Sequence, residues 1–144
     1  MPKKRGKSKK QKQLERLGAL WGAIIRYRDK YVCRWCGKGH TPGDSSYHAS
    51  HIKPKSQGHA ARFDLLNGKG LCFHCHMHKW HKDPIAANKF LKTIRSDEEI
   101  DYLESLTGMV KNYTLDDLLE MENNFKVELE KQKYEYDEWL HKGD

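Results

Sequence analysis

Residues 33–81 read CRWCGKGHTPGDSSYHASHIKPKSQGHAARFDLLNGKGLCFHCHMHKWH, and they hold all four cysteines and eight of the nine histidines of the 144-residue chain. The cysteines form two C-x-x-C pairs: Cys33 with Cys36, and Cys72 with Cys75. Two such pairs supply the four thiolates of a closed, tetrahedral structural zinc site. We therefore expect Zn²⁺ at these cysteines. Reduced free thiols, or a site in which a histidine replaces one cysteine, are the alternatives.

The chain shows no signal for export or for a membrane. No run of eighteen apolar residues is present, so no membrane span is expected. The basic N-terminus is not followed by an apolar segment, so a secretory signal is not expected either. These features predict a cytoplasmic protein, a reducing setting in which paired cysteines bind metal rather than form disulfides.

Charge divides the chain into three parts. Residues 1–13 carry seven Lys/Arg and no acid, and they predict a disordered basic tail that lies along phosphates or only aids solubility. Residues 14–83 form the expected zinc-stapled core with a leading helix. Residues 84–144 form an expected acidic helical extension, since residues 96–144 carry fifteen acidic and five basic residues. The surplus of basic residues in the first two parts favours a polyanionic partner.

The pattern of apolar residues and helix caps predicts an α+β fold. Apolar positions at helical spacing predict a helix over residues 14–31. Pro84 is expected in the first turn of a helix that ends at Ile94, and Ser96 and Thr114 are typical caps of two further helices. Short strands are expected near Tyr47–Ile52 and before the second cysteine pair, with about two helical turns after it.

The segment between the cysteine pairs carries a second set of reactive side chains. Hydrolysis of a phosphodiester needs a base for water and a cation at the phosphate. We interpret His51, at the end of a strand, as that base, because a neutral imidazole is available near pH 7. Asn67 is expected to hold the other nitrogen of this imidazole, and His76 is expected to present a nitrogen to a divalent metal.

The order His, Asn, His over a β–β–α segment resembles the HNH nucleases, which have the ββα-metal fold. The stretch CRWCGK…ASHIKP…RFDLLNGKGLCFHCHMHKWH is similar to a zinc-knuckle HNH endonuclease. The run KFLKTI…EEIDYLESL…KNYTLDDLLEMENNFKVELEK is similar to the NinG/Rap recombination family of lambdoid phages. Together these resemblances cover about residues 33–131.

The resemblance implies a metal-dependent endonuclease with His51 as general base, Asn67 as the middle Asn and His76 as a ligand of the catalytic metal. It also implies that the four cysteines hold structural zinc, that Mg²⁺ or Mn²⁺ is the working metal, and that DNA, including branched or junction DNA, is the substrate. A phage-encoded protein would act in the bacterial host cytoplasm. The C-terminal helices would form a homodimer, bind a recombination or replication partner, or cover the nuclease core.

Two departures from the family pattern concern the metal. Many HNH enzymes have Asp or His directly before the base, where this chain has Ser50. His48, on the same strand face as Ser50, is a candidate to compensate. His81 is a further candidate ligand, although five residues of an α-helix would separate it from His76 by about 500° of rotation. Members of the NinG/Rap family tend to have Asn at the position of His76.

Basic residues around these histidines are candidate phosphate contacts. They are Lys53, Lys55, Arg62, Lys69, Lys79 and Lys82. An ordinary solvated surface is the alternative for each. For the whole chain, the alternative to an endonuclease is a non-catalytic zinc protein that binds DNA or junctions by shape and charge. A partner-binding adaptor built on the acidic segment is a third function.

Overall fold

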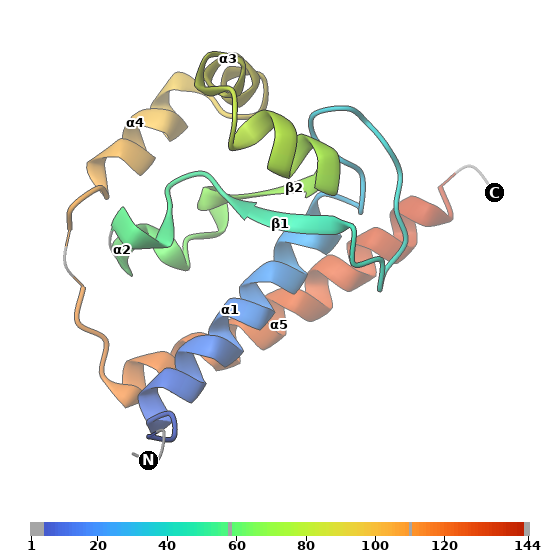
Figure 1. The fold of residues 1–144 in the computed structure, drawn as a ribbon. Helices are drawn as coiled ribbons and strands as arrows, with labels where there is room; N and C mark the ends of the chain where they lie inside the picture. Colours follow the sequence, from blue (N-terminus) through green and yellow to red (C-terminus); the bar gives the residue numbers. More distant parts are fainter. Residues whose placement is uncertain (1–4, 58, 110, 143–144) are drawn as a thin grey trace.

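The computed structural model describes residues 5–57, 59–109 and 111–142. Their α+β arrangement agrees with the expectation from the sequence, and Figure 1 shows it. The elements in chain order are α1 (Lys9–Arg28), β1 (Tyr47–His51), η1 (Lys55–Gln57), α2 (His59–Arg62), η2 (Leu65–Asn67), β2 (Gly68–Cys72), η3 (Cys75–Trp80), α3 (Pro84–Ile94), α4 (Asp97–Ser105) and α5 (Leu115–Leu140).

The sheet has two antiparallel strands, β1 and β2, in a register that runs from Tyr47 opposite Cys72 to His51 opposite Gly68. One face packs on α1, so closely that a Cβ added at Gly68 would lie 2.6 Å from the Trp21 ring. The other face lies toward η3, as Figure 1 shows. Successive side chains of a strand point to opposite faces of the sheet. Ser50 and His51, neighbours in β1, therefore lie on different faces.

Helix α1 begins earlier than the hydrophobic pattern predicts. Ser8 caps it, and the side chain of Gln11 bonds back to the Ser8 backbone in a capping box. Residues 9–13, expected in a disordered tail, are therefore helical. Gln13 is buried, and its Nε2 donates to the Leu118 carbonyl of α5 at 3.3 Å. Residues 1–4 of the expected tail lie outside the described residues.

Helix α5 lies alongside α1, as Figure 1 shows. Leu118 of α5 shares a buried cluster with Leu17 of α1 and with Phe63, which directly follows α2. A second contact joins Tyr136 to Tyr27 and Tyr31 edge-on, with ring centres 5.4 and 5.9 Å apart. The end of the acidic segment thus packs on the leading helix and on Tyr31, which directly follows it.

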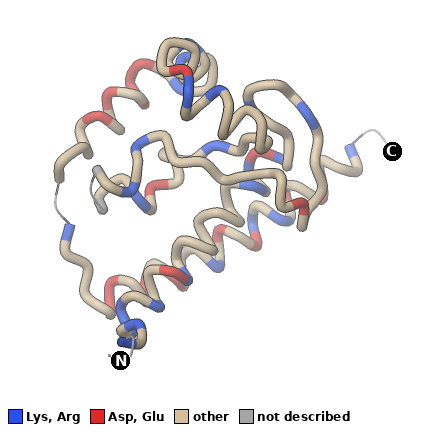
Figure 2. The backbone as a smooth tube through the Cα atoms, viewed as in Figure 1, with Lys and Arg blue, Asp and Glu red and all other residues tan. Residues whose placement is uncertain are grey.

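The predicted helix caps beyond the cysteines are confirmed. The Asp83 carboxylate accepts from the backbone of Ala86 at the start of α3, with Pro84 in the first turn. Ser96 and Thr114 each form a capping box with the acid three residues later. Figure 2 shows acidic residues gathered on α4 and α5 and basic residues at the N-terminal end of α1. No described helix is long and apolar enough to cross a membrane.

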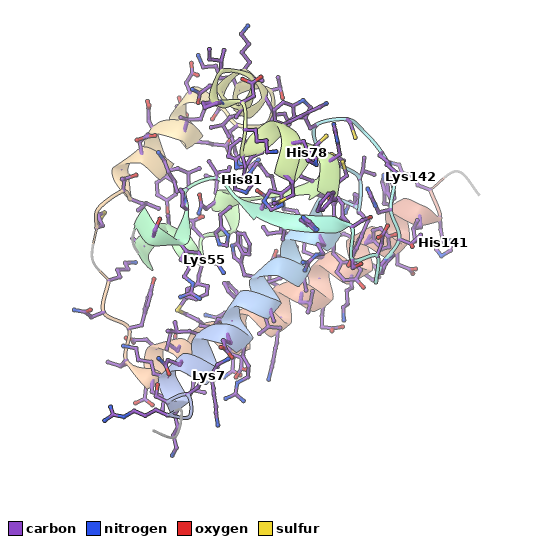
Figure 3. All side chains as sticks on the ribbon, in the orientation of Figure 1. Lys7, Lys55, His78, His81, His141 and Lys142 are labelled. Carbon is purple, nitrogen blue, oxygen red and sulfur yellow. The ribbon has the colours of Figure 1, made fainter. Side chains whose placement is uncertain are left out.

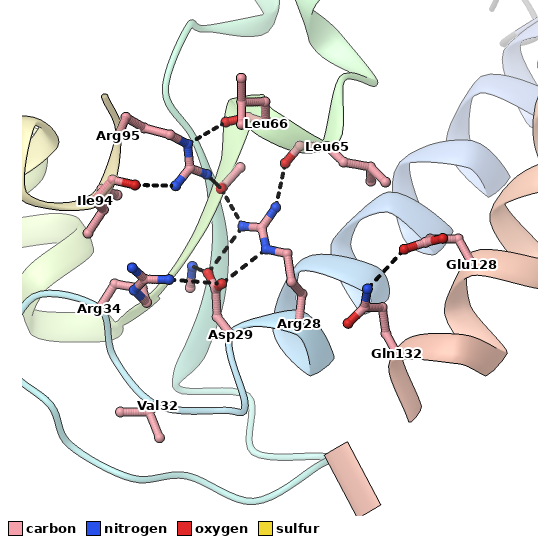
Figure 4. Close-up of polar contacts among 12 residues, drawn as sticks. Arg28, Asp29, Val32, Arg34, Leu65, Leu66, Ile94, Arg95, Glu128 and Gln132 are labelled. Carbon is pink, nitrogen blue, oxygen red and sulfur yellow. Dashed lines mark hydrogen bonds and ion pairs between the residues drawn. The ribbon is translucent and has the colours of Figure 1, made fainter. Parts of the chain in front are cut away.

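A buried ionic network joins α1 to the segment before β2 (Figure 4). Asp29 is buried and bonds to Arg28, to Arg34 and to the backbone N–H of Gly70. Arg28 donates to the carbonyls of Leu65 and Gly68, at 2.6 and 2.7 Å. Arg95, after α3, donates to Gly68 as well, at 2.7 Å, and to Leu66. The network fixes the backbone around Asn67.

Candidate metal centre and catalytic site

The four cysteines come together as predicted. One sulfur from each lies within 4.8 Å of the other three, in a group that could hold a metal ion such as zinc. Cys36 Sγ lies 3.8 Å from Cys72 Sγ, which is about the edge length of a tetrahedron with Zn–S bonds of about 2.3 Å. This separation also far exceeds a disulfide bond. The donor set and its spacing therefore fit a closed four-thiolate site.

Both cysteine turns direct backbone N–H groups at sulfur. The N–H of Cys36 donates to Cys33 Sγ at 3.5 Å, and the N–H of Cys75 donates to Cys72 Sγ at 3.4 Å. Gly37 follows with a φ of 79°, the left-handed conformation that its position after the first pair predicts. Burial would raise the pKa of the Cys33 thiol, but hydrogen bonds, led by the backbone of Cys36, lower it to about 7.

The cysteine cluster is also the centre of a hydrophobic core. Cys33, Cys72 and Cys75 are buried with Leu71 and Phe90. Trp35 stacks on Phe90 with ring centres 4.4 Å apart, and Trp80 meets the same ring edge-on at 6.3 Å. Both tryptophans therefore pack beside the cysteines.

The imidazole of His51 lies on the α1 side of the sheet. It stacks on Trp21 with ring centres 4.0 Å apart and an interplanar angle of 10°. Its Nε2 lies 3.1 Å from the Arg62 carbonyl oxygen. Because a carbonyl only accepts, Nε2 carries the hydrogen and donates, and Nδ1 carries the lone pair of the neutral ring. Burial, with smaller contributions from Lys55 and Lys69, lowers the pKa of His51 to about 4.

His51 opens into a cavity of about 370 Å³ between α1 and the segment after β1. Lys55, which Figure 3 labels, and Arg62 line it, and both are predicted phosphate contacts. Arg26 of α1 adds a third cation that the sequence did not single out, although it follows Gly22 by one helical turn on the same face. Glu15 is the acid in the lining, and it pairs with Lys7 at 2.5 Å.

Asn67 does not hold the imidazole of His51, contrary to the prediction. Its side chain is 0 % exposed and bonds to the backbone of Lys53. Asn67 Oδ1 accepts from the Lys53 N–H at 2.7 Å, and Nδ2 donates to the Lys53 carbonyl at 3.0 Å. The amide thus fixes the turn directly after His51. Arg62 and Trp21 orient the imidazole instead.

Three of the candidate metal ligands meet on the opposite face of the sheet. His48 Nδ1 lies 2.9 Å from His76 Nδ1, and His81 Nε2 lies 3.0 Å from His76 Nε2. The second contact exists because η3 is a π-helix, closed by a hydrogen bond of 3.2 Å from the His81 N–H to the His76 carbonyl. Its wider turn brings residues five apart onto one face, which an α-helix would not do.

These contacts restrict what the three histidines can bind together. His48 and His81 face different nitrogens of His76, and among described residues no three metal-binding side chains besides the cysteines form a compact group. His76 and His81 can share an ion through Nε2, or His48 and His76 through Nδ1. Burial lowers the pKa of His76 to about 4, helped by His81 and His48, so the imidazole is neutral and able to bind metal.

Lys69 is not a surface phosphate contact, contrary to the prediction. Its side chain is 0 % exposed. Nζ donates to Ser50 Oγ at 2.9 Å and to the His51 carbonyl at 3.2 Å, and it lies 3.4 Å from the centre of the Trp80 ring. Burial holds the pKa of Lys69 well below its usual range. The buried amine of Lys69 therefore stabilises the last two residues of β1, Ser50 and His51, by hydrogen bonds.

The other predicted phosphate contacts differ in their neighbours and in their exposure to solvent. Lys53 forms an ion pair with Glu104 of α4, which offsets its charge. Lys79 lies over the Trp35 ring at 5.5 Å, and Lys82 is exposed. Lys55 and Arg62, at the cavity beside His51, are therefore the best placed of the set to meet a phosphate.

No family model, curated protein or solved structure matches this chain.

Proposed function

We propose that this protein is a metal-dependent HNH-type endonuclease that hydrolyses phosphodiester bonds of DNA. The observation that carries the proposal is the state of His51. Its Nε2–H bonds to a carbonyl 3.1 Å away and leaves Nδ1 unprotonated, and its lowered pKa keeps the ring neutral. A fixed imidazole with one bare nitrogen beside cations can take a proton from water near a phosphodiester, and a pKa of about 4 makes it a weaker base than one with a pKa near the working pH.

In the proposed reaction, Nδ1 of His51 takes a proton from the water that attacks phosphorus. Arg26, Lys55 and Arg62 line the same cavity and stabilise the charge that develops on the phosphate oxygens. Asn67 and Lys69 hold the backbone at His51 and directly after it, by bonds to Lys53 and to the His51 carbonyl. These two residues position the base without touching the substrate.

His76 and His81 would hold the divalent metal through their Nε2 atoms. A metal held there would polarise a phosphate and stabilise a departing 3′ oxygen. Because the His51 ring lies on the opposite face of the sheet, against Trp21, the scissile phosphate must bind at the C-terminal end of β1, within reach of both faces. The donors are imidazoles, and among the described residues no carboxylate joins them in a compact group. Of the two ions expected, imidazole donors favour Mn²⁺ over Mg²⁺, which prefers oxygen ligands. The four cysteines would hold the structural Zn²⁺.

A cleavage assay tests the proposal. The purified protein is incubated with supercoiled plasmid and with a four-way junction, in Mn²⁺, Mg²⁺ or EDTA. We expect metal-dependent cutting that H51A abolishes while DNA binding is retained. Binding without cutting in every metal would contradict the nuclease and support the alternative, a non-catalytic zinc protein that binds DNA. Full DNA activity without residues 96–144 would count against the adaptor role of the acidic segment.

A further inference from the structure

The loop after the first cysteine pair contains a buried histidine that the proposed nuclease does not use. The side chain of His40 is 2 % exposed. Its Nδ1 lies 2.9 Å from Asp44 Oδ2, and its backbone N–H donates to the Tyr31 carbonyl at 2.8 Å. The Asp44 carboxylate is itself fixed, because Oδ1 accepts from the backbone and from the hydroxyl of Ser46 at 2.9 and 2.7 Å.

This arrangement determines which nitrogen of His40 carries the hydrogen. The hydrogen bond from His40 holds the pKa of the Asp44 carboxyl well below its usual range, so the carboxylate accepts and Nδ1 donates. In the neutral ring the lone pair is then on Nε2. A histidine that donates one N–H to a carboxylate while the other nitrogen stays bare is the usual form of a metal-bound histidine.

Nε2 of His40 is one of two buried side-chain nitrogen or oxygen atoms among the described residues that have no hydrogen-bond partner. Buried polar atoms are rarely left without a partner unless they have another role. His40 lines a cavity of about 390 Å³ together with Cys36, Cys72 and Cys75. Cys36 is the exposed member of the four cysteines. The His40 side chain, with its bare buried nitrogen, thus lines the same cavity as the most accessible cysteine of the cluster.

We propose that His40 is a reserve ligand of the structural metal, whose Nε2 replaces the sulfur of Cys36 when that thiolate is lost. The inference rests on the proposed zinc site. In the four-sulfur state Nε2 of His40 has no hydrogen-bond partner. The His40 side chain lines the same cavity as Cys36. Gly37 and Gly39 lie between the two residues, and no atom outside the neighbouring residues lies within 4 Å of a Cβ added at either. The loop therefore has room to carry Nε2 toward the metal, giving a Cys₃His set.

Cobalt spectroscopy of the full-length protein tests this inference. Co²⁺ replaces Zn²⁺, and its absorption reports both tetrahedral geometry and the number of thiolate bonds. The wild type and H40A should both give a four-thiolate spectrum. C36A should keep a tetrahedral spectrum, with charge-transfer intensity lowered by one thiolate and visible bands moved to shorter wavelength. C36A/H40A should lose the tetrahedral bands and bind Zn²⁺ at least about tenfold more weakly than C36A.

The matched control is C36A/H74A, since His74 lines the same cavity. It should behave like C36A. Equal spectra for C36A and C36A/H40A, or loss of the bands in C36A/H74A alone, would overturn the role of His40. A C36A protein that takes up no Co²⁺ and stays unfolded would overturn it too, because a reserve ligand should retain the metal. A wild type that binds neither metal would instead refute the zinc site itself, independently of the cleavage assay.

Discussion

His76 Nε2 and His81 Nε2 lie 3.0 Å apart across one turn of a π-helix. An α-helix would have turned these side chains away from each other, so the wider turn creates the pair. Regular helices rarely adopt this geometry, and it is frequent at functional sites. The pair is therefore the part of the proposed active site that depends most on local backbone structure.

Replacing either member of this pair should weaken metal-dependent cleavage much more than replacing a neighbour. We expect H76A and H81A to lower cleavage about 10- to 100-fold or more at limiting Mn²⁺. H78A is the matched control on the same helix, since His78 contacts the rings of Phe73 and His74 rather than His76. Cleavage measured over a Mn²⁺ titration checks this. Equal losses in all three variants would point to damage to the helix.

We expect Asn67 to affect activity by stabilising the folded protein and not by contact with the reacting groups. N67A removes the amide that satisfies both the N–H and the carbonyl of Lys53 in a buried setting. We expect the free energy of unfolding to fall by about 2–4 kcal/mol, since each unpaired buried group costs about 1–3 kcal/mol. Urea denaturation measures it. Lost cleavage with unchanged stability would show instead that Asn67 touches the reacting groups.

Salt dependence of DNA binding separates surface cations from the buried one. K55A and R62A should each lower the slope of log affinity against log salt by about 0.9, since each removes one phosphate contact. K69M should leave the slope unchanged, because the Lys69 side chain is buried between the sheet and Trp80 of η3. Fluorescence anisotropy with a labelled duplex checks this. A shallower slope for K69M would mean that the lysine reaches DNA.

Stability should fall as the pH drops from about 6.5 toward 4. The pKa of His51 is lowered from 6.5 to about 4 in the folded protein, chiefly by burial. Between these values the unfolded chain binds more protons, so the free energy of unfolding rises with pH through this window. Urea denaturation between pH 4 and pH 7 should show this slope, reduced in H51Q. A slope that is identical in H51Q would assign the effect to other groups.

Zinc removal should disrupt the core around the cysteines. Metal binding and folding are coupled in such sites, and protons compete with the metal for thiolates. We expect a strong chelator to change the fluorescence of Trp35 and Trp80, which pack against this core, and to act at lower concentration as the pH falls. Excess Zn²⁺ should restore the signal. Unchanged fluorescence after complete metal removal, confirmed by elemental analysis, would contradict a structural role.

The sequence predicted the parts of the structure that depend on local chemistry. The caps at Ser96 and Thr114, the turn at Gly37 and the cysteine spacing each follow from short-range geometry, and each is confirmed. The start of α1 was missed because Ser8 and Gln11 form a capping box inside a basic run that looks disordered.

The contacts within the candidate site depend on tertiary structure, so the sequence pattern could not predict them. Asn67 has several potential partners near the turn, and only the fold selects the Lys53 backbone. Lys69 resembles any surface lysine until β2 is placed between α1 and η3. The contact between His76 and His81 requires a π-helix, which the spacing of apolar and polar residues does not predict.

We propose that this chain holds two separate metal centres, a closed one at the four cysteines and an open one at His76 and His81. Anomalous diffraction from crystals soaked in Mn²⁺ tests it most directly. We predict a zinc signal among the four sulfurs and a manganese signal bound to His76 and His81, on the face of the sheet opposite the His51 ring. A manganese signal confined to the four sulfurs, or absent near both histidines, would contradict the account.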